Sequence, residues 1–235
     1  HNIVGLDKLN DYYSIELKNF RNEKNLSNKN YDFINGDVCD RHLISAIFEQ
    51  HKFDVVLHLA AQAGVRLPID KIYLYGQSNL IGYENIAVNV LKHEISNFLY
   101  ASSSSVYGDL ANYPLSENEK ILNPNSYYGV TKLSNELAAS ALFKNSSVKS
   151  RGLRFFSVYG PLGRPDMAYF RIINSAINNQ EFKLFGDGAI KRDFTFIEDA
   201  AHIVIKLTEE LVARKVNSVD VVNVGGGSPM SMRDL

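Results

Sequence analysis

A tyrosine and a lysine four residues apart are the first candidates for chemistry in this sequence. Tyr128 and Lys132 would share one face of a helix, because residues four apart are neighbours on a helix surface. A free phenol has a pKa of about 10 and is a poor base at neutral pH. A cation within about 4–6 Å lowers that pKa. We therefore expect Lys132 to make Tyr128 able to take a proton from a substrate hydroxyl, although a surface pair has the same spacing.

Four consecutive serines precede this pair. Ser102–Ser105 follow the apolar segment Phe98–Ala101, which we expect to be a strand. Ligands of open parallel sheets bind beyond the carboxyl ends of the strands, and hydroxyls there suit a polyhydroxy substrate as hydrogen-bond partners. A serine-rich turn is the alternative. The nearby tyrosine–lysine pair favours the binding interpretation.

Strands and helices are expected to alternate along the chain. Short β-rich runs, several of them almost continuously apolar as in strands covered on both faces, predict strands at Asn2–Asp7, Tyr31–Asn35, Asp54–Leu59, Asn97–Ser102, Lys149–Phe156, Phe182–Phe185 and Asp220–Val224. Helical patterns predict helices from the cap Asp40 to about His51, then at Leu80–His93, Tyr127–Phe143, Ala168–Asn178 and Asp199–Leu211, with Ser231 and Asp234 capping a further one. Such alternation is typical of an α/β fold with a doubly wound, Rossmann-like parallel sheet.

The character of the chain changes after Gly160. We expect a nucleotide-binding domain over residues 1–160 and a smaller, discontinuous α/β substrate lobe over residues 161–235. The glycines at 225–227 follow an expected strand and are interpreted as a turn that ends it.

Composition limits the classes of function. The 235 residues include 25 basic and 26 acidic side chains, so the net charge of -1 does not suit a nucleic-acid binder. No apolar run is long enough to cross a membrane. Cys39 is the single cysteine and the six histidines lack ligand spacing, so we expect no disulfide, no metal and a cytoplasmic location.

Three motifs in order carry a family resemblance. SSSSVYG (102–108), YGVTK (128–132) and RFFSVYGP (154–161) resemble the extended short-chain dehydrogenase/reductase family, which acts on nucleotide sugars. LDKLNDYY (6–13), AAQAGVR (60–66) and GRPDMA (163–168) are similar to the UDP-glucuronate 4-epimerase branch of that family. The resemblance runs over essentially the whole chain.

The resemblance implies NAD as cofactor. Asp7 would accept both adenosine ribose hydroxyls and repel a 2′-phosphate, although Lys8 stands where the family usually has Asn and weakens that preference. The other implied cofactor contacts, besides Tyr128 and Lys132, are Asp37, Val38, Leu59, Ala60, Ala61 and Asn79.

The resemblance also implies the catalytic and substrate residues. Ser103 would be the catalytic serine, Tyr128 the base and Lys132 its electrostatic partner. Arg164 would grip the carboxylate of a uronic sugar, Arg192 the diphosphate, and Phe185 would pack on the uracil. Ser104, Ser105 and Ser157 would assist Arg164; Ser157 occupies a position that is usually Thr in this branch.

The activity implied is a 4-epimerisation of UDP-glucuronate and UDP-galacturonate through a 4-keto sugar, by a homodimer serving polysaccharide synthesis. A dehydratase would need an acid and a base after the catalytic residue, where this chain has Ser104 and Ser105. A UDP-sugar decarboxylase, another epimerase and a non-catalytic nucleotide-sugar-binding protein remain as alternatives.

One expected feature is missing from the sequence. The phosphate-binding G-x-x-G-x-x-G loop of this family, with its strand and helix, would precede His1. We therefore expect the first βα unit of the fold to lie outside these 235 residues.

Overall fold

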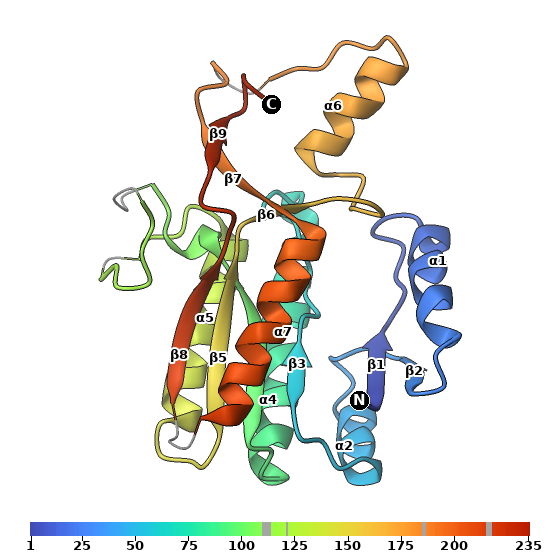
Figure 1. The fold of residues 1–235 in the computed structure, drawn as a ribbon, viewed down its shortest axis with the longest axis vertical. Coiled ribbons are helices and arrows are strands. Elements are labelled where there is room, and N and C mark those ends of the chain that lie inside the picture. The colour runs from blue at the N-terminus through green and yellow to red at the C-terminus, as the bar shows by residue number, and fades with distance from the viewer. Residues whose placement is uncertain (110–113, 121, 185–186, 215–217) are drawn as a thin grey trace.

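A computed structural model describes residues 1–109, 114–120, 122–184, 187–214 and 218–235 (Figure 1). Its strands are β1 (Ile3–Asp7), β2 (Tyr31–Asn35), β3 (Val56–His58), β4 (Asn97–Ser103), β5 (Lys149–Phe155), β6 (Ser157–Tyr159), β7 (Lys191–Phe196), β8 (Val219–Val224) and β9 (Pro229–Ser231). Its helical elements are α1 (Ile15–Leu26), α2 (Arg41–Gln50), η1 (Ile69–Lys71), α3 (Tyr73–Tyr75), η2 (Gly76–Ile81), α4 (Gly82–Lys92), η3 (Ser104–Val106), α5 (Tyr127–Phe143), α6 (Ala168–Ile177) and α7 (Ile197–Ala213).

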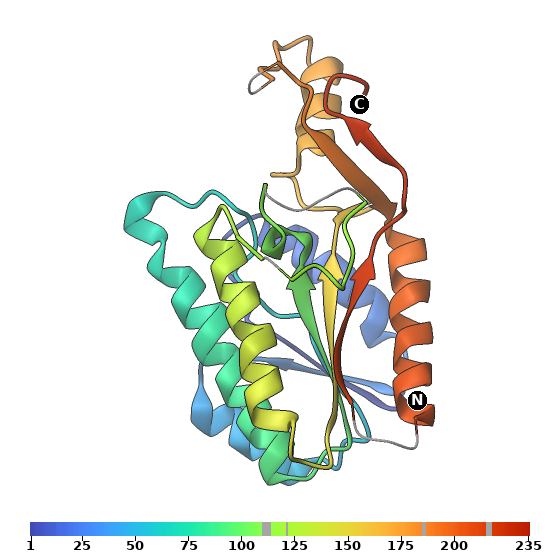
Figure 2. The same ribbon diagram turned by 90° about the vertical axis from the view of Figure 1, so that its left-hand side faces the viewer.

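The central sheet is parallel and has the order β3-β4-β5-β8. Helices cover both of its faces: Figure 2 shows α4 and α5 on one side and α7 on the other. This arrangement confirms the predicted doubly wound α/β fold. The carboxyl ends of β4 and β5 lie side by side, since Ser102 pairs with Arg154 and Ser103 with Phe155.

The alternation of side chains along β4 divides the core between the two faces. Phe98 and Tyr100 belong to the cluster formed with α2, α4 and α5, whereas Leu99 belongs to the cluster under α7. Successive strand residues point to opposite faces, so a strand covered on both sides needs apolar residues at nearly every position. This is the physical reason for the continuous apolar run.

Helix starts follow their capping residues. Asp40 caps α2 by accepting hydrogen bonds from the backbone of His42 and Leu43, both at 3.0 Å, as predicted. Ser126 caps α5 by accepting from Gly129 at 3.0 Å, and α5 has the predicted bounds. The predicted start at Leu80 was wrong. Helical structure begins earlier, through α3 and the π-helical η2. The apolar pattern did not predict this start, because buried polar residues such as Asn79 interrupt it.

A smaller lobe contains β6, β7, β9 and α6 (Figure 1). The predicted strand Lys149–Phe156 is confirmed as β5, which ends at Phe155. The next strand, β6, was not predicted, and it pairs with β7 in another sheet. Residues 182–184 do not form the strand predicted there, and Phe185 lies outside the described residues. β8 ends at Val224, before the three glycines, as predicted. Ser231 accepts a hydrogen bond from the Asp234 backbone at 3.2 Å, but within a turn after β9.

The remaining strands, β1 and β2, form a separate parallel pair. Strand β8 and helix α7 pack with the central sheet although they follow Gly160 in the sequence. The domain boundary at 160 and the additional first βα unit remain predictions.

Candidate active site

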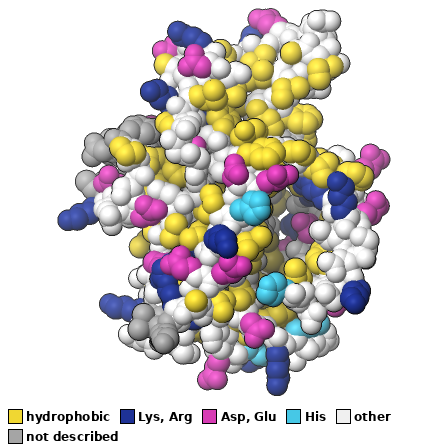
Figure 3. All heavy atoms as spheres, viewed as in Figure 1, with side chains coloured by type: hydrophobic (Ala, Val, Ile, Leu, Met, Phe, Trp, Pro, Cys, Tyr) yellow, Lys and Arg dark blue, Asp and Glu magenta, His cyan; other side chains and the backbone are white. Residues whose placement is uncertain are grey.

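A cleft lies between the β1–β2 pair and the central sheet, and the surface is visibly hollowed there (Figure 3). It forms at the carboxyl ends of β1, β2 and β3, where an α/β sheet binds its ligands. Six of the residues predicted to bind cofactor line it: Asp7, Asp37, Val38, Leu59, Ala60 and Ala61. The structure therefore brings these six together.

The two carboxylates of the cleft have different partners. Asp7 accepts a hydrogen bond from the backbone of Leu9 at 2.7 Å. Asp37 accepts from the backbone of Cys39 at 2.9 Å and forms an ion pair with Lys8 at 3.0 Å. Desolvation raises the pKa of Asp37, but the contacts with Cys39 and Lys8 outweigh it and lower the pKa overall. Lys8 thus neutralises Asp37 and makes no ion pair with Asp7.

Tyr128 and Ser103 meet at the end of β4. Ser103 is buried at the last position of the strand, and its Oγ accepts a hydrogen bond from the backbone of Ser105 at 3.1 Å. The side chains of Ser103 and Tyr128 are also hydrogen-bonded. Burial raises the pKa of Tyr128, while the bond with Ser103 and the charge of Arg164 act in the opposite direction.

Lys132 lies one helical turn further along α5. Its Nζ donates a hydrogen bond to the carbonyl oxygen of Ala101 at 2.8 Å and is 5.9 Å from the centroid of the Tyr128 ring. Burial lowers the pKa of Lys132 to about 8. The prediction that Lys132 lowers the Tyr128 pKa below its usual value was wrong for this structure, because the desolvation of the phenol dominates.

Asn79 connects the cleft to α5. Its Oδ1 accepts from the backbone of Gln62 at 2.8 Å, and its Nδ2 donates to Thr131 Oγ1 at 3.0 Å. Thr131 in turn donates to the carbonyl oxygen of Tyr128 at 2.7 Å. Asn79 is buried and does not line the cleft itself, so its contacts position the cleft loop against α5.

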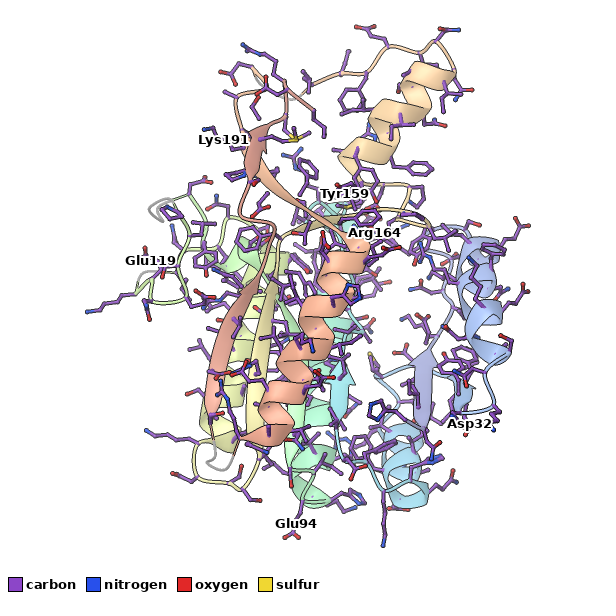
Figure 4. The ribbon with its side chains drawn as sticks, in the orientation of Figure 1. Asp32, Glu94, Glu119, Tyr159, Arg164 and Lys191 are labelled. Carbon is purple, nitrogen blue, oxygen red and sulfur yellow. The ribbon has the colours of Figure 1, made fainter. Side chains whose placement is uncertain are left out.

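The predicted substrate residues are divided between two places. Ser104 and Ser105 lie in η3, directly after Ser103. Ser157 is the first residue of β6, which follows the carboxyl end of β5, beside the carboxyl end of β4. Arg164 lines the cleft from the loop between β6 and α6 (Figure 4). Its charge acts on Tyr128.

Arg192 is not brought to this cluster. Arg192 is exposed on β7 of the smaller lobe and donates to the carbonyl oxygen of Lys191 at 3.1 Å. Within the described residues it has no hydrogen bond to the other predicted site residues. Phe185 is outside the described part of the chain. The roles of both stay predictions.

The sequence analysis missed Asp166 and Tyr12. Asp166 accepts hydrogen bonds from Nε and Nη2 of Arg164 at 2.9 and 3.0 Å, and Tyr12 Oη donates to Asp166 at 3.4 Å. Both residues fall inside quoted motifs, GRPDMA and LDKLNDYY. Asp166 follows Arg164 by two residues, and this spacing could have predicted that the acid contacts the arginine.

Tyr75 was missed as well. Its ring centroid is 5.9 Å from that of Tyr128, and its hydroxyl donates to the carbonyl oxygen of Gly64. Tyr75 therefore connects the loop after Ala63 to the surroundings of Tyr128. The sequence around Tyr75 has only a weak helical pattern, so it did not predict that Tyr75 contacts Tyr128.

Neither a metal cluster nor a membrane-spanning helix is found in the ranges that the structure describes. No group of three His, Cys, Asp or Glu side chains there is arranged to hold a metal ion. None of the described helices combines the length and the apolar composition that a membrane crossing requires.

Comparison with known proteins identifies relatives over nearly the whole chain. "Protein CapI" of Staphylococcus aureus is 36% identical and is matched over 100% of this chain and 74% of its own length. The UDP-glucuronate 4-epimerase of Thermodesulfobacterium geofontis is 33% identical over 99% of this chain and 70% of its own. The structure of the Bacillus cereus UDP-glucuronic acid 4-epimerase with UDP-glucuronic acid and NAD has a TM-score of 0.88 and 32% identity, covering 99% of this chain and 72% of that one. The pattern of the NAD dependent epimerase/dehydratase family matches residues 2–225, and the chain belongs to that family.

Proposed function

We propose that this protein is an NAD-dependent 4-epimerase that interconverts UDP-glucuronate and UDP-galacturonate. The observation that carries the proposal is the meeting of Ser103, Tyr128 and Lys132 at one end of the sheet, with Arg164 acting on Tyr128 from the cleft wall. The similar proteins named as UDP-glucuronate 4-epimerases support the choice of sugar.

The polar groups in and behind the cleft fit NAD. Lys132 is 2% exposed, and its ammonium has three donors, of which one is used by Ala101 within the described residues. A buried donor without a partner is costly, so Lys132 suits a ribose hydroxyl. Asp7 offers a carboxylate for the adenosine ribose, and Ala60 and Ala61 allow close approach to the backbone.

Tyr128 acts as the base in the proposed reaction. NAD supplies an acceptor for the hydride from the sugar C4 and returns it afterwards. Tyr128 takes the proton of the 4-hydroxyl, and Ser103 holds the phenol in place through their hydrogen bond. Because the phenol is desolvated, proton transfer needs further positive charge near Tyr128. Arg164 provides such charge in this structure.

Arg164 has a second proposed role. The 4-keto sugar of a uronate is a β-keto acid, which can lose CO2. A fixed cation stabilises the carboxylate relative to neutral CO2, so Arg164 would oppose this loss. Arg164 is itself oriented by its two hydrogen bonds to Asp166.

The alternatives differ in the step that comes after oxidation of the sugar. A dehydratase needs an acid–base pair, and the hydroxyls of Ser104 and Ser105 do not supply one. A decarboxylase shares the substrate and would release a UDP-pentose. A binding protein would have no use for a phenol beside a buried lysine, and both are found here.

The test is incubation of the protein with NAD and either UDP-glucuronate or UDP-glucose, with NMR of the product sugars. We expect UDP-galacturonate from UDP-glucuronate and little conversion of UDP-glucose. Conversion of UDP-glucose alone would remove the uronate assignment, and release of UDP-pentose would indicate a decarboxylase. No turnover of either, despite bound NAD, would favour the binding protein.

We also propose a homodimer formed by α4 and α5. Val130 and Leu137 are exposed apolar residues seven apart on α5, so they lie on one helix face. Val88 of α4, and Ile81 at the end of η2 just before it, are exposed apolar residues as well. The two helices lie next to each other on the face away from α7 (Figure 2). Leu137→Glu should reduce the mass measured by light scattering to that of a monomer. Ile205→Glu, at an exposed apolar position on α7, is the matched control.

The proposed setting is the cytoplasm, where the single thiol of Cys39 remains reduced. There the product would supply uronate units for polysaccharide synthesis.

A further inference from the structure

A buried ion pair lies directly behind the candidate catalytic residues. Arg154 Nε and Nη2 donate to Glu136 Oε1 and Oε2 at 2.9 and 2.8 Å, and the two side chains are 3% and 7% exposed. Ser102 Oγ donates to Glu136 Oε1. Since Ser102 and Arg154 are partners across β4 and β5, one carboxylate on α5 joins two neighbouring strands at their carboxyl ends.

The contacts of α5 with the end of β4 form a series. Tyr128, Lys132 and Glu136 lie four residues apart on one helix face and contact Ser103, the Ala101 carbonyl and Ser102, respectively. Three successive turns of α5 therefore contact the last three residues of β4, although not in chain order. A shift of the helix along the sheet would separate Tyr128 from Ser103.

Stability alone does not explain an ion pair at this place. Replacing a buried ion pair by apolar residues of similar volume is often neutral or stabilising, whereas removing one partner is strongly destabilising. The Arg154 guanidinium also lies 4.7 Å from the centroid of the Tyr107 ring and interacts with the Tyr107 side chain. In some proteins a buried charged pair is kept because it specifies one geometry.

We infer that Glu136 is a positioning residue of the reaction: held by Arg154, it fixes the register of α5 on β4 and thereby keeps Tyr128 against Ser103. The inference rests on the proposed epimerase function for its kinetic test. It adds a residue that neither contacts the substrate nor lines the cleft.

The test replaces both partners by residues of similar size. The double variant Glu136→Met, Arg154→Met should unfold at a temperature close to that of the wild type and should bind UDP unchanged. Its kcat should fall at least tenfold while KM changes less than threefold. The acid limb of the kcat–pH profile should move to higher pH, because the hydrogen bond with Ser103 lowers the Tyr128 pKa and would be weakened. A wild-type kcat and pH profile would overturn the inference.

The matched control is the other buried arginine of β5. Arg151 donates from Nε and Nη2 to Asp220 at 2.7 and 2.9 Å, at the opposite end of the strand. Arg151→Met, Asp220→Met should leave kcat and the pH profile unchanged. An equal fall of kcat in this control would also overturn the inference, since any lost ion pair would then suffice.

Two further measurements cover failure of folding and failure of the function. If the double variant does not fold, Ser102→Ala removes the link between Glu136 and β4; we expect a three- to tenfold loss of kcat, and no loss would refute the inference. The phenolate of Tyr128 can be titrated by ultraviolet absorbance, as the difference from the same protein with Tyr128→Phe. Its titration should move to higher pH in the double variant even if no UDP-sugar is turned over, so the two failures are distinguishable.

Discussion

Lys132 Nζ is hydrogen-bonded to the carbonyl oxygen of Ala101 at 2.8 Å, while it lies 5.9 Å from the ring centroid of Tyr128. One of the three donors of the ammonium group is therefore held by β4, and no hydrogen-bond partner of the other two is found in the described residues. The charge that acts on Tyr128 in this structure comes instead from Arg164.

The buried ammonium predicts a pH dependence of stability. Burial lowers the Lys132 pKa from 10.5 to about 8, so between these values the unfolded chain binds more protons than the folded one. Stability of the wild type relative to Lys132→Met should therefore be constant below pH 8. Above it, the difference should rise by up to about 1.4 kcal/mol per pH unit. Urea unfolding of both proteins from pH 6 to 10 measures this difference in the free energy of unfolding. If the difference does not depend on pH, the lowered Lys132 pKa is contradicted.

Removal of the phenol predicts loss of activity without loss of fold. Tyr128→Phe should reduce kcat by about 10²- to 10⁴-fold, the usual contribution of a general base, and should leave the thermal midpoint within a few degrees. The matched control is Tyr127→Phe, because the neighbouring tyrosine is exposed on the same helix. Equal activity of Tyr128→Phe and the wild type in the NMR assay would refute the assignment of the base.

Loss of the cation predicts a change in sugar preference. Arg164→Met should raise KM for UDP-glucuronate about 10- to 100-fold, since a hydrogen bond to a charged group contributes about 1.5–3 kcal/mol. Affinity for UDP itself should be unchanged. We also expect more UDP-pentose among the products, measured by NMR. An unchanged KM would show that the carboxylate binds elsewhere.

Loss of the Asp166 carboxylate should raise KM for UDP-glucuronate less than loss of Arg164 does. Asp166→Asn removes the charge and one of the two hydrogen bonds that orient the guanidinium. KM for UDP-glucuronate should rise about three- to tenfold, roughly the value of one hydrogen bond, and kcat should change little. A fall in KM would instead identify Asp166 as a competitor of the substrate carboxylate.

Local sequence patterns predicted most of the secondary structure. The cap at Asp40, the full extent of α5 and the positions of the central strands along the chain followed from side-chain types a few residues apart. The patterns failed where a segment's environment changes within a few residues. One example is β6, which begins at Ser157 directly after the end of β5, lies in another sheet and was not predicted as a strand.

The sequence by itself determined that Tyr128 and Lys132 share a helix face and that the serines follow a strand, because helix and strand periodicity are local properties of the chain. Only the tertiary structure decided the pKa values of Tyr128 and Lys132 and which distant residues hold the surrounding elements in place. Glu136 meets Arg154 across 18 residues, and Tyr12 meets Asp166 across 154. The pKa of Tyr128 depends on how completely folding removes water from its ring. Such pairings and desolvation arise from packing between distant elements, which no spacing of residues along the chain specifies.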